Sequence, residues 1–378
     1  MKELSECRVL IVDDVPANVD VLVQALRGEY QLSVAIDGTS ALRTAEKLLP
    51  DLVLLDIMMP GIDGYEVCRR LRASPQTREI PVMFLSSLED VQNKTKGFEA
   101  GGNDYLVKPF EVLEVKARVR SLLRAKAYAD AVKEKIAYDL RIAREIQMGI
   151  LPPDVAAVAE GTGLEAHAIL HPAQEVGGDL YEVLRTPEGN LVVVMGDVSG
   201  KGIPAALFMA VTTTLVRAMA PESPRSNEIL RRVSDALVSH NPRNMFVTVL
   251  CAIYDHCTGK LEYASAGHPP AVLVREGQAS FLPTEPDVAA GIMTGLAANS
   301  QSVQLQAGDL VVFYTDGVTE AFNAAGELYG ETRLLKELAG HSGYTAAEST
   351  AALLRSVRAH AGDHPQSDDI AILALKRK

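Results

Sequence analysis

The sequence predicts an α/β domain, then one long helix, then a larger α+β domain. Three patterns support this order. Short apolar runs alternate with helical segments in the first part, a middle stretch is almost free of Gly and Pro, and in the final part strands follow strands and helices follow helices. We expect a first domain at residues 1–120, a helical linker at 121–151 and a second domain at 152–378. The chain of 378 residues is long enough for this organisation.

The composition is that of a globular protein that does not bind nucleic acid. Hydrophobic residues make up 47% of the chain, and 37 Lys and Arg against 49 Asp and Glu give a net charge of −12. Phosphate backbones are bound by basic surfaces, so this charge argues against nucleic acid. The apolar runs are of strand length and the N-terminal segment lacks the apolar core of a signal peptide, so we expect a cytoplasmic protein without a membrane segment. The four cysteines show no CxxC spacing, so we expect buried or idle thiols rather than a zinc site or a disulfide framework.

The first domain shows a regular alternation of strands and helices. The strand-like runs are "VLIVDD", "LSVAI", "LVLLDI", "VMFLSS" and "DYLVKP", with helices expected at 17–27, 39–48 and 64–73. Strands that are apolar almost throughout are typical of a parallel sheet covered by helices on both faces. The sequence therefore predicts five strand–helix units in residues 1–120.

Polar and charged residues stand where these strands end. Asp13 and Asp14 follow the first strand, Asp56 follows the third, and Ser86 and Lys108 close the fourth and fifth. The carboxyl ends of parallel strands meet at one edge of the sheet. A single aspartate at such a position can be a helix cap, but five groups on four strand ends favour a shared site. Three gathered carboxylates predict Mg²⁺, which prefers oxygen ligands.

This set, with "MMPGIDG" after Asp56, resembles the response-regulator receiver domain over residues 7 to 120. The resemblance implies a flavodoxin-like (βα)5 fold in which a sensor histidine kinase phosphorylates Asp56 and the three aspartates hold Mg²⁺. On phosphorylation the domain would change at the face after the fourth strand. The resemblance also implies that Lys108 contacts the phosphoryl group and that Ser86 forms a hydrogen bond to it. Tyr105 would be an aromatic switch that rotates inward.

The middle stretch predicts one long helix that runs from Leu113 to Met148 and ends at "LPP". It carries a heptad pattern of apolar residues that Asp139 interrupts. One interpretation is a parallel coiled-coil-like dimer through residues 121–151; the other is an amphipathic helix lying on one of its own domains. The a positions are Leu122, Ala129, Ile136, Ala143 and Ile150, and the d positions are Ala125, Val132 and Ile146.

The final part predicts antiparallel sheets, possibly stacked as a sandwich, flanked by helices. The hairpin signal "HCTGK" and the grouping of strands indicate this arrangement. Strands are expected at 165–170, 191–196, 247–254, 261–266, 271–275, 310–315 and 370–375. Helices are expected at 204–219, 226–240, 332–339 and 346–360.

Four short motifs in this part carry aspartates next to strong strands. They are "VGGDLYE" with Asp179, "GDVSGKG" with Asp197, "FYTDGVTE" with Asp316, and "QSDDIAIL" with Asp368 and Asp369. None contains His or Cys, and an all-oxygen set indicates Mg²⁺ or Mn²⁺, of which such a set can hold two. Neighbouring glycines would allow a close backbone approach or a positive φ. Any one motif could be a turn or a solvated loop, but the four together favour a metal site.

In order along the chain, "EIQMGILPP", "EVGGDLYE", "GDVSGKGIPAALFMA", "YASAGHPPAVL", "GDLVVFYTDGVTEAFN" and "SDDIAILAL" resemble a SpoIIE-type phosphatase domain. This is the bacterial branch of the PPM (protein phosphatase 2C-like) metal-dependent Ser/Thr phosphatases, whose fold is a β-sandwich flanked by helices. The resemblance implies two Mn²⁺ or Mg²⁺ ions, with Asp197 bridging both and the Val198 carbonyl as a further ligand. Of the adjacent pair, it favours Asp368 over Asp369 as the metal ligand. The catalytic ligands it implies are Asp179, Asp197, Asp316 and Asp368.

Three positions differ from or add to this pattern. The superfamily often has a histidine just after the bridging aspartate, as a general acid, and here Val198 follows. His268 in "AGHPP" is expected to have a structural, hydrogen-bonding role. Lys201 could attract a substrate phosphate or have no role.

Together the motifs predict a two-component response regulator with a protein Ser/Thr phosphatase as output. The resemblance implies that its substrate is a phosphorylated anti-sigma-factor antagonist, a small STAS-domain protein. Two alternatives stay open: a non-catalytic adaptor whose phosphatase-like domain only binds a partner, and a constitutive phosphatase that the receiver merely tethers. Whether phosphorylation of Asp56 activates or inhibits is also open.

Overall fold

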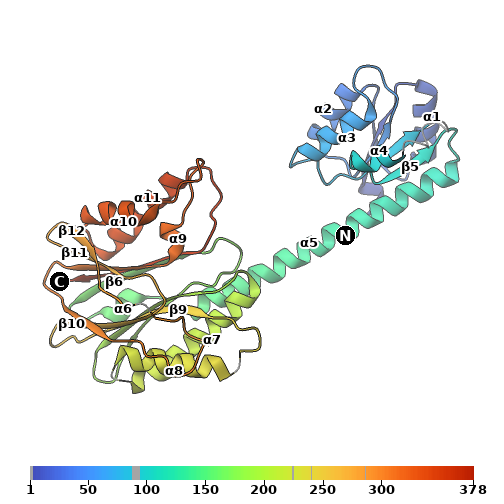
Figure 1. The fold of residues 1–378 in the computed structure, drawn as a ribbon. Coiled ribbons are helices and arrows are strands. Elements are labelled where there is room, and N and C mark those ends of the chain that lie inside the picture. Colours follow the sequence, from blue (N-terminus) through green and yellow to red (C-terminus); the bar gives the residue numbers. More distant parts are fainter. Residues whose placement is uncertain (1–2, 87–93, 224, 240, 286) are drawn as a thin grey trace. The chain divides into compact units, whose positions relative to one another are not determined.

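Figure 1 shows the computed structural model of the chain. It describes residues 3–86, 94–223, 225–239, 241–285 and 287–378. The chain forms two compact units, Met1–Tyr138 and Asp139–Lys378. The division between them falls within the expected helical linker, so the three-part division at residues 120 and 151 stays a prediction.

The first unit is the expected doubly wound parallel sheet. Its strands have the order β2-β1-β3-β4-β5, and every neighbouring pair is parallel. The short helix η1 is Leu4–Glu6. The strands are β1 (Arg8–Val12), β2 (Gln31–Ala35), β3 (Leu52–Asp56), β4 (Val82–Ser86) and β5 (Asp104–Val107). The helices are α1 (Pro16–Leu26), α2 (Gly38–Leu48), α3 (Gly64–Ala73) and α4 (Lys94–Glu99).

Two apolar cores cover the faces of this sheet, which explains why its strands are apolar almost throughout. In β1, Val9 and Ile11 face one core and Leu10 and Val12 face the other, as the alternation of side chains along a strand requires. The first core also takes up α1 and the start of the long helix α5 (Val112–Ile150), through residues spaced four apart. These are Val115, Val119 and Leu123. Helix α5 ends one residue before "LPP", as predicted.

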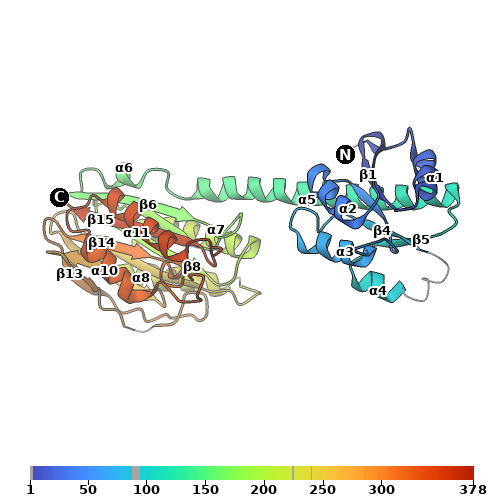
Figure 2. The same cartoon turned by 90° about the horizontal axis from the view of Figure 1, so that it is seen from above.

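The second unit is a sandwich of two antiparallel five-stranded sheets between two layers of helices (Figure 1). The sheet orders are β13-β10-β9-β8-β7 and β12-β11-β14-β15-β6. Helices α7 and α8 cover the first sheet, and α10 and α11 cover the second (Figures 1 and 2). The predicted sandwich is therefore confirmed.

The bounds of these elements match most of the predicted ranges. The strands are β6 (Leu164–His171), β7 (Leu180–Arg185), β8 (Leu191–Val198), β9 (Val247–Tyr254), β10 (Lys260–Ala266), β11 (Val272–Arg275), β12 (Gln278–Phe281), β13 (Gln301–Gln304), β14 (Leu310–Tyr314) and β15 (Ile370–Arg377). The helices are α6 (Val155–Ala159), α7 (Ile203–Met219), η3 (Ala220–Glu222), α8 (Ser226–Ser239), α9 (Asp316–Thr319), α10 (Gly330–Ala339) and α11 (Ala346–Ala361). The expected helix 226–240 ends at the last described residue before 240.

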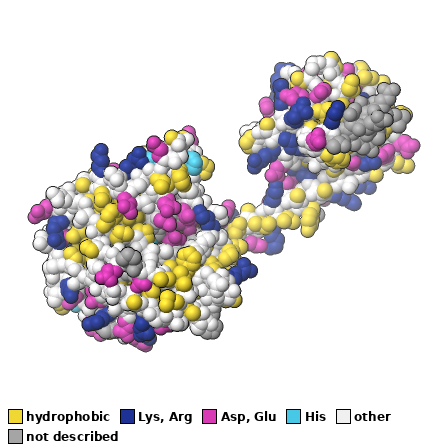
Figure 3. All heavy atoms as spheres, in the orientation of Figure 1, with side chains coloured by type: hydrophobic (Ala, Val, Ile, Leu, Met, Phe, Trp, Pro, Cys, Tyr) yellow, Lys and Arg dark blue, Asp and Glu magenta, His cyan; other side chains and the backbone are white. Residues whose placement is uncertain are grey.

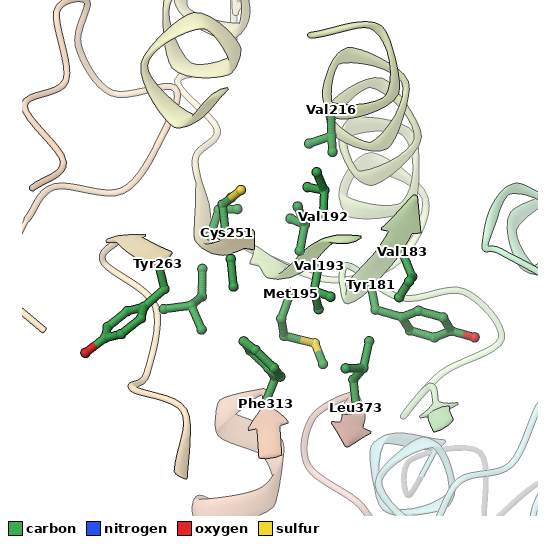
Figure 4. Packing of buried hydrophobic residues seen from close by; sticks show 14 of the residues in the cluster. Tyr181, Val183, Val192, Val193, Met195, Val216, Cys251, Tyr263, Phe313 and Leu373 are labelled. Carbon is green, nitrogen blue, oxygen red and sulfur yellow. The ribbon is translucent and has the colours of Figure 1, made fainter. Parts of the chain in front are cut away.

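The central strand β8 shows how the sandwich is held together. All of its first six residues are buried. Figure 4 shows Val192 directed toward Val216 of α7, while Met195 is directed toward Phe313 and Leu373 of the other sheet. The strand is therefore buried on both faces, which positions its final residues at one end of the sandwich.

Helix α7 is a core helix, although Ile203–Glu222 is long and apolar enough to cross a membrane by length and composition. One face of α7 is buried in the sandwich core and contacts β7, β8 and α8. A membrane segment is not needed to explain its composition. The buried residues are Ala205, Met209, Thr212, Thr213 and Val216.

Candidate functional site

The first unit brings its strand-end aspartates together. Carboxylate oxygens of Asp13, Asp14 and Asp56 all lie within 4.8 Å of one another. Asp13 and Asp56 are buried, at 0% and 4% exposure. Three ionisable oxygen donors at this spacing are suited to Mg²⁺. The residues present therefore fit the ion that the resemblance implies.

Lys108 joins this cluster from the end of β5. Its Nζ lies 2.8 Å from Oδ2 of Asp13 and 2.9 Å from Oδ1 of Asp56. Burial raises the pKa of Asp56, while the hydrogen bond from Lys108 opposes that rise. Asn18 and the backbone N–H of Val15 also donate to Asp13, which fixes its orientation.

Ser86 ends β4, and Tyr105 is the second residue of the neighbouring strand β5. The Ser86 hydroxyl is buried and has no hydrogen-bond partner among the described residues, which suits an acceptor that arrives later. Tyr105 is buried beside Phe84 and Phe98, each with its ring centroid 5.4 Å away, and burial raises the pKa of Tyr105 to about 12. A Cβ on Gly97 of α4 would lie 1.3 Å from the Tyr105 hydroxyl oxygen, so the ring is inward. The first residues after β4, 87–93, lie outside the described residues.

The second unit gathers its aspartates at one end of the sandwich, from both sheets. Asp179 directly precedes β7, and Asp197 is the penultimate residue of β8, in the first sheet. Asp316 begins α9 after β14, and Asp368 lies two residues before β15, in the second sheet. Asp179 and Asp197 are close enough to share a hydrogen bond.

These carboxyl groups strongly perturb one another. Complete burial raises the pKa of Asp179 far above its usual value, and the neighbouring Asp197 raises it further. Burial, and then the charges of Asp316 and Asp368, raise the pKa of Asp197 to about 7. Burial also raises the pKa of Asp316, followed by the charges of Glu320 and Asp368. Divalent cations would relieve this repulsion, and the all-oxygen donor set fits Mn²⁺ or Mg²⁺.

Asp368 and Asp369 are adjacent but have different surroundings. The buried Asp369 carboxylate accepts backbone N–H groups from Ala173 and Gly178, both at 2.7 Å. Asp368 has a side chain 34% exposed, with its Oδ2 2.9 Å from Nζ of Lys201. Asp369 therefore braces the backbone of the loop that carries Asp179, and the more exposed carboxylate of Asp368 remains the candidate ligand.

Three glycines in these motifs are required by close packing. A Cβ on Gly177 would lie 2.0 Å from Oδ2 of Asp369, and one on Gly317 would lie 1.9 Å from its carbonyl oxygen. A Cβ on Gly178 would lie 2.8 Å from the Val198 carbonyl oxygen, which therefore faces the loop that carries Asp179. None of the three has a positive φ. Of the two roles expected for them, close approach is the one observed.

His268 is buried and structural, as predicted. Its Nε2 lies 3.1 Å from the Tyr314 carbonyl, to which it must donate, and its Nδ1 lies 2.9 Å from the Thr248 hydroxyl. Burial lowers the pKa of His268 to about 4, so the ring is neutral near pH 7. It fastens the end of β14, two residues before Asp316.

Sequence analysis missed three residues around the site: Thr315 and Gln147, which support Asp179 and its loop, and Arg217, which links α7 to the end of α5. Thr315 donates from Oγ1 to Oδ2 of Asp179 at 2.7 Å. Gln147, near the end of α5, is 5% exposed; its Nε2 donates to the Gly177 carbonyl at 2.6 Å and its Oε1 accepts the Gly177 N–H at 3.2 Å. Arg217 of α7 donates both to Glu182 and to the carbonyl of Ile150, the last residue of α5. The only available signals were a hydroxyl before Asp316 and a Gln among the heptads.

Comparisons with known proteins divide the chain in the same way. Residues 187–378 match the family model of Stage II sporulation protein E (SpoIIE), and residues 9–120 match that of the response regulator receiver domain. The PP2C domain of SiaA from Pseudomonas aeruginosa has a TM-score of 0.59 and 24% identity, covering 66% of this chain and 99% of that one. The PP2C phosphatase domain of SpoIIE from Bacillus subtilis has a TM-score of 0.50 and 17% identity, covering 56% and 63%. At these identities the two structures show the fold alone.

Curated relatives match part of the chain. Response regulator PleD of Caulobacter vibrioides is 42% identical over 157 residues, which are 41% of this chain and 33% of PleD. The transcriptional regulator RpaA of Synechocystis is 46% identical over 118 residues, 31% of this chain and 49% of RpaA. The chain thus spans between a third and a half of the length of these relatives.

Proposed function

Because the chain belongs to the SpoIIE family through residues 187–378 and carries a response-regulator receiver domain at 9–120, we propose that it is a response regulator whose output is a metal-dependent protein-serine/threonine phosphatase. The observation that carries this proposal is the set of four buried or partly buried carboxylates at one end of the sandwich, whose charges repel one another. All four positions implied for metal ligands are acidic. A non-catalytic adaptor, the alternative, has no need of such a set.

In the receiver, Asp56 accepts a phosphoryl group from a sensor histidine kinase. Asp13, Asp14 and Asp56 would hold Mg²⁺, which neutralises phosphoryl charge when bound. Lys108, now paired with Asp13 and Asp56, supplies a second positive charge to the phosphoryl oxygens. The Ser86 hydroxyl, unpartnered among the described residues, then finds an acceptor, and Tyr105 lies inward against Phe84 of the same strand, β4.

In the phosphatase domain, Asp179, Asp197, Asp316 and Asp368 would hold two Mn²⁺ or Mg²⁺ ions, with Asp197 shared and the Val198 carbonyl as an additional donor. Bound ions of this kind lower the pKa of coordinated water and neutralise phosphoryl charge, so a phosphoric monoester can be hydrolysed without a side-chain nucleophile.

The chain's own residues position the ligands and the substrate. Thr315 holds the Asp179 carboxylate, and Asp369 holds the backbone that carries it. Lys201, 2.9 Å from Asp368, brings positive charge to the edge of the site. The two hydrogen bonds of His268 and its lowered pKa leave it unable to donate a proton to the leaving group near pH 7.

Regulation would reach this site through the end of α5. Gln147 clasps both polar groups of Gly177, two residues before Asp179, and Arg217 binds the carbonyl of Ile150. A rotation or shift of the last turn of α5 must therefore strain or release the loop that carries Asp179. This link supports control of the phosphatase by the receiver over a constitutive, merely tethered enzyme.

The same helix supports a homodimer through residues 121–151. The heptad residues Val132, Ile136 and Ile146 are 40%, 53% and 63% exposed, and Ala125 and Ala129 are exposed too. Figure 3 shows hydrophobic side chains at the surface of this part of α5. An amphipathic helix lying on its own domain would cover them, whereas a coiled-coil partner buries such a seam.

The substrate, partners and location complete the proposal. The SpoIIE relationship favours a phosphorylated STAS-type anti-sigma-factor antagonist as substrate. The acidic net charge of −12 favours no nucleic-acid partner, and the burial of one face of α7 favours a cytoplasmic protein without a membrane segment.

The test is Mn²⁺-dependent phosphate release from a phospho-STAS protein, with and without a phosphoryl mimic on Asp56, in the wild type and Asp197→Asn. We expect metal-dependent turnover that changes with the mimic and is lost in the variant. A small aryl phosphate run in parallel separates a wrong protein substrate from an inactive enzyme. Absence of turnover in both receiver states would overturn the proposal that the protein is an enzyme. Equal turnover in both states would overturn the proposal that the receiver regulates it.

A further inference from the structure

A second group of possible metal ligands lies in the turn between β9 and β10, formed by Asp255, His256 and Cys257. One ligand atom from each lies within 4.8 Å of the other two. Strand β9 begins opposite Val198 and ends opposite Leu191, at the two ends of β8. The turn is therefore at the end of the first sheet opposite to Asp197, outside the acidic site described above.

The imidazole of His256 is held by the neighbouring β7–β8 turn. Its Nδ1 lies 3.3 Å from Oδ1 of Asn190, an acceptor, so Nδ1 carries the proton and donates. A Cβ on Gly189 would lie 3.1 Å from Cε1 of His256, so the ring packs directly on that turn. Nε2 is then the unprotonated nitrogen, and its lone pair faces the Cys257 thiol 3.4 Å away. A hydrogen bond that fixes the other ring nitrogen is typical of histidines that bind metals.

Nε2 of His256 and the thiol of Cys257 are at a spacing that suits one ion. The Nε2–Sγ distance is 3.4 Å. With zinc–nitrogen and zinc–sulfur distances of about 2.0 and 2.3 Å, two ligands of a tetrahedral ion lie about 3.5 Å apart. The separation of the two atoms therefore matches that of two ligands on one ion. Cys257 is also the exposed thiol of the chain, since Cys7, Cys68 and Cys251 are buried.

The Asp255 carboxylate shapes the turn as well as offering a third ligand. Its Oδ1 accepts the backbone N–H groups of Cys257 at 2.8 Å and Thr258 at 3.1 Å. These bonds hold the second and third residues after Asp255 against its carboxylate, and lone pairs remain on the carboxylate oxygens for a cation.

We propose that Asp255, His256 and Cys257 bind one borderline divalent cation of the Zn²⁺ type, with water completing the coordination. The sulfur and nitrogen donors select this class over Mg²⁺ and Mn²⁺, which prefer oxygen alone. Binding replaces the S–H bond of Cys257 by a metal–sulfur bond and releases the proton to solvent. The site is independent of the phosphatase chemistry. The expectation of idle thiols considered only cysteine pairs, and the partner here is the adjacent histidine.

Co²⁺ is the probe for this site, added to the reduced full-length protein. A thiolate ligand produces a sulfur-to-cobalt charge-transfer band that the all-oxygen sites cannot produce, so the two kinds of site are distinguishable. We expect one such band per chain, saturating at one equivalent and displaced by Zn²⁺. Cys257→Ser should abolish the band although three cysteines remain. Asn190→Ala, which removes only the second-shell partner of His256, should weaken binding about 10-fold.

His256→Ala should also weaken binding, while His364→Ala, a change at another exposed histidine, should leave it unchanged. Thermal unfolding of the metal-free variants should match the wild type because the replaced side chains are at the surface. The proposal is overturned if the wild type shows no charge-transfer band, if Cys257→Ser retains it, or if it saturates at half an equivalent, which would indicate an ion bridging two chains.

Discussion

Alanine substitutions at the adjacent aspartates Asp368 and Asp369 should have different effects, one on activity and the other on stability. Asp369→Ala removes the acceptor of two backbone N–H bonds, each 2.7 Å long, in a residue only 7% exposed. Asp368→Ala removes a more exposed carboxylate, which pairs with the half-exposed Lys201 and accepts the backbone N–H of Asp369 at 2.9 Å. We expect the first change to destabilise the second unit and the second change to destroy activity.

The magnitudes follow from these contacts. Hydrogen bonds to a charged group contribute about 1.5–3 kcal/mol each, so two would contribute about 3–6 kcal/mol. Removing a charge from the crowded acidic cluster offsets part of this, and we expect a net loss of about 3 kcal/mol. For a unit of this size that lowers the melting temperature by about 6–12 °C. A surface ion pair contributes less than about 1 kcal/mol, so Asp368→Ala should melt within about 3 °C of the wild type.

The assay combines calorimetry of the full chain with Mn²⁺-dependent phosphate release. Asp368→Ala should lose more than about 100-fold in activity, because loss of a ligand exceeds the 10–100-fold effect of outer-shell partners. The reasoning is refuted if Asp369→Ala melts like the wild type while Asp368→Ala melts much lower. Full activity of Asp368→Ala would refute its assignment as a ligand.

Three further predictions concern residues away from the metal ligands. Gln147→Ala leaves the backbone N–H and carbonyl of Gly177 unpaired, so it should lower the free energy of unfolding of the second unit by about 2–3 kcal/mol in urea titrations. It should also make phosphatase activity independent of phosphorylation at Asp56. Glu145→Ala, on the exposed side of the helix, is the control, and equal effects of the two changes would contradict the role of the Gln147–Gly177 hydrogen bonds. The pKa of His268, about 4 in the fold against 6.5 in the unfolded chain, means that its contribution is present above pH 6.5 and lost as the pH falls toward 4. Between pH 7 and 5 the wild type should lose about 2 kcal/mol more than His268→Gln, and parallel pH profiles would argue against a neutral buried ring. Ile136→Asp should convert a dimer to a monomer in light scattering while Glu134→Gln does not, and an unchanged mass would count against the coiled coil.

Sequence analysis predicts best those elements whose burial produces a recognisable pattern of apolar residues in a short stretch of sequence. The strands β1, β3, β4 and β8 are buried on both faces, so each appears as an unbroken apolar run. The strands it missed lack that pattern. β12 and β13 form the outer edges of their sheets and have no fully buried residue, while β7 begins within a motif interpreted for its aspartate.

The residues of the candidate site also differ in whether a local sequence pattern reveals them. The aspartates could be found because each sits in a short motif beside a strand. Gln147, Thr315 and the bracing role of Asp369 depend on pairs separated by 30, 136 and 191 residues in the chain. No local pattern encodes such pairs, so they appear only once the fold brings the partners together.

The glycines packed against these aspartates would mislead a genetic screen. Alanine at Gly177, Gly178 or Gly317 would collide with Asp369 or with the Val198 carbonyl, so loss-of-function alleles should accumulate at these positions as readily as at the ligands themselves. Their products would be misassembled rather than chemically incompetent, and a suppressor that shrinks or shifts a neighbour could rescue them. No suppressor of that kind could replace a missing carboxylate.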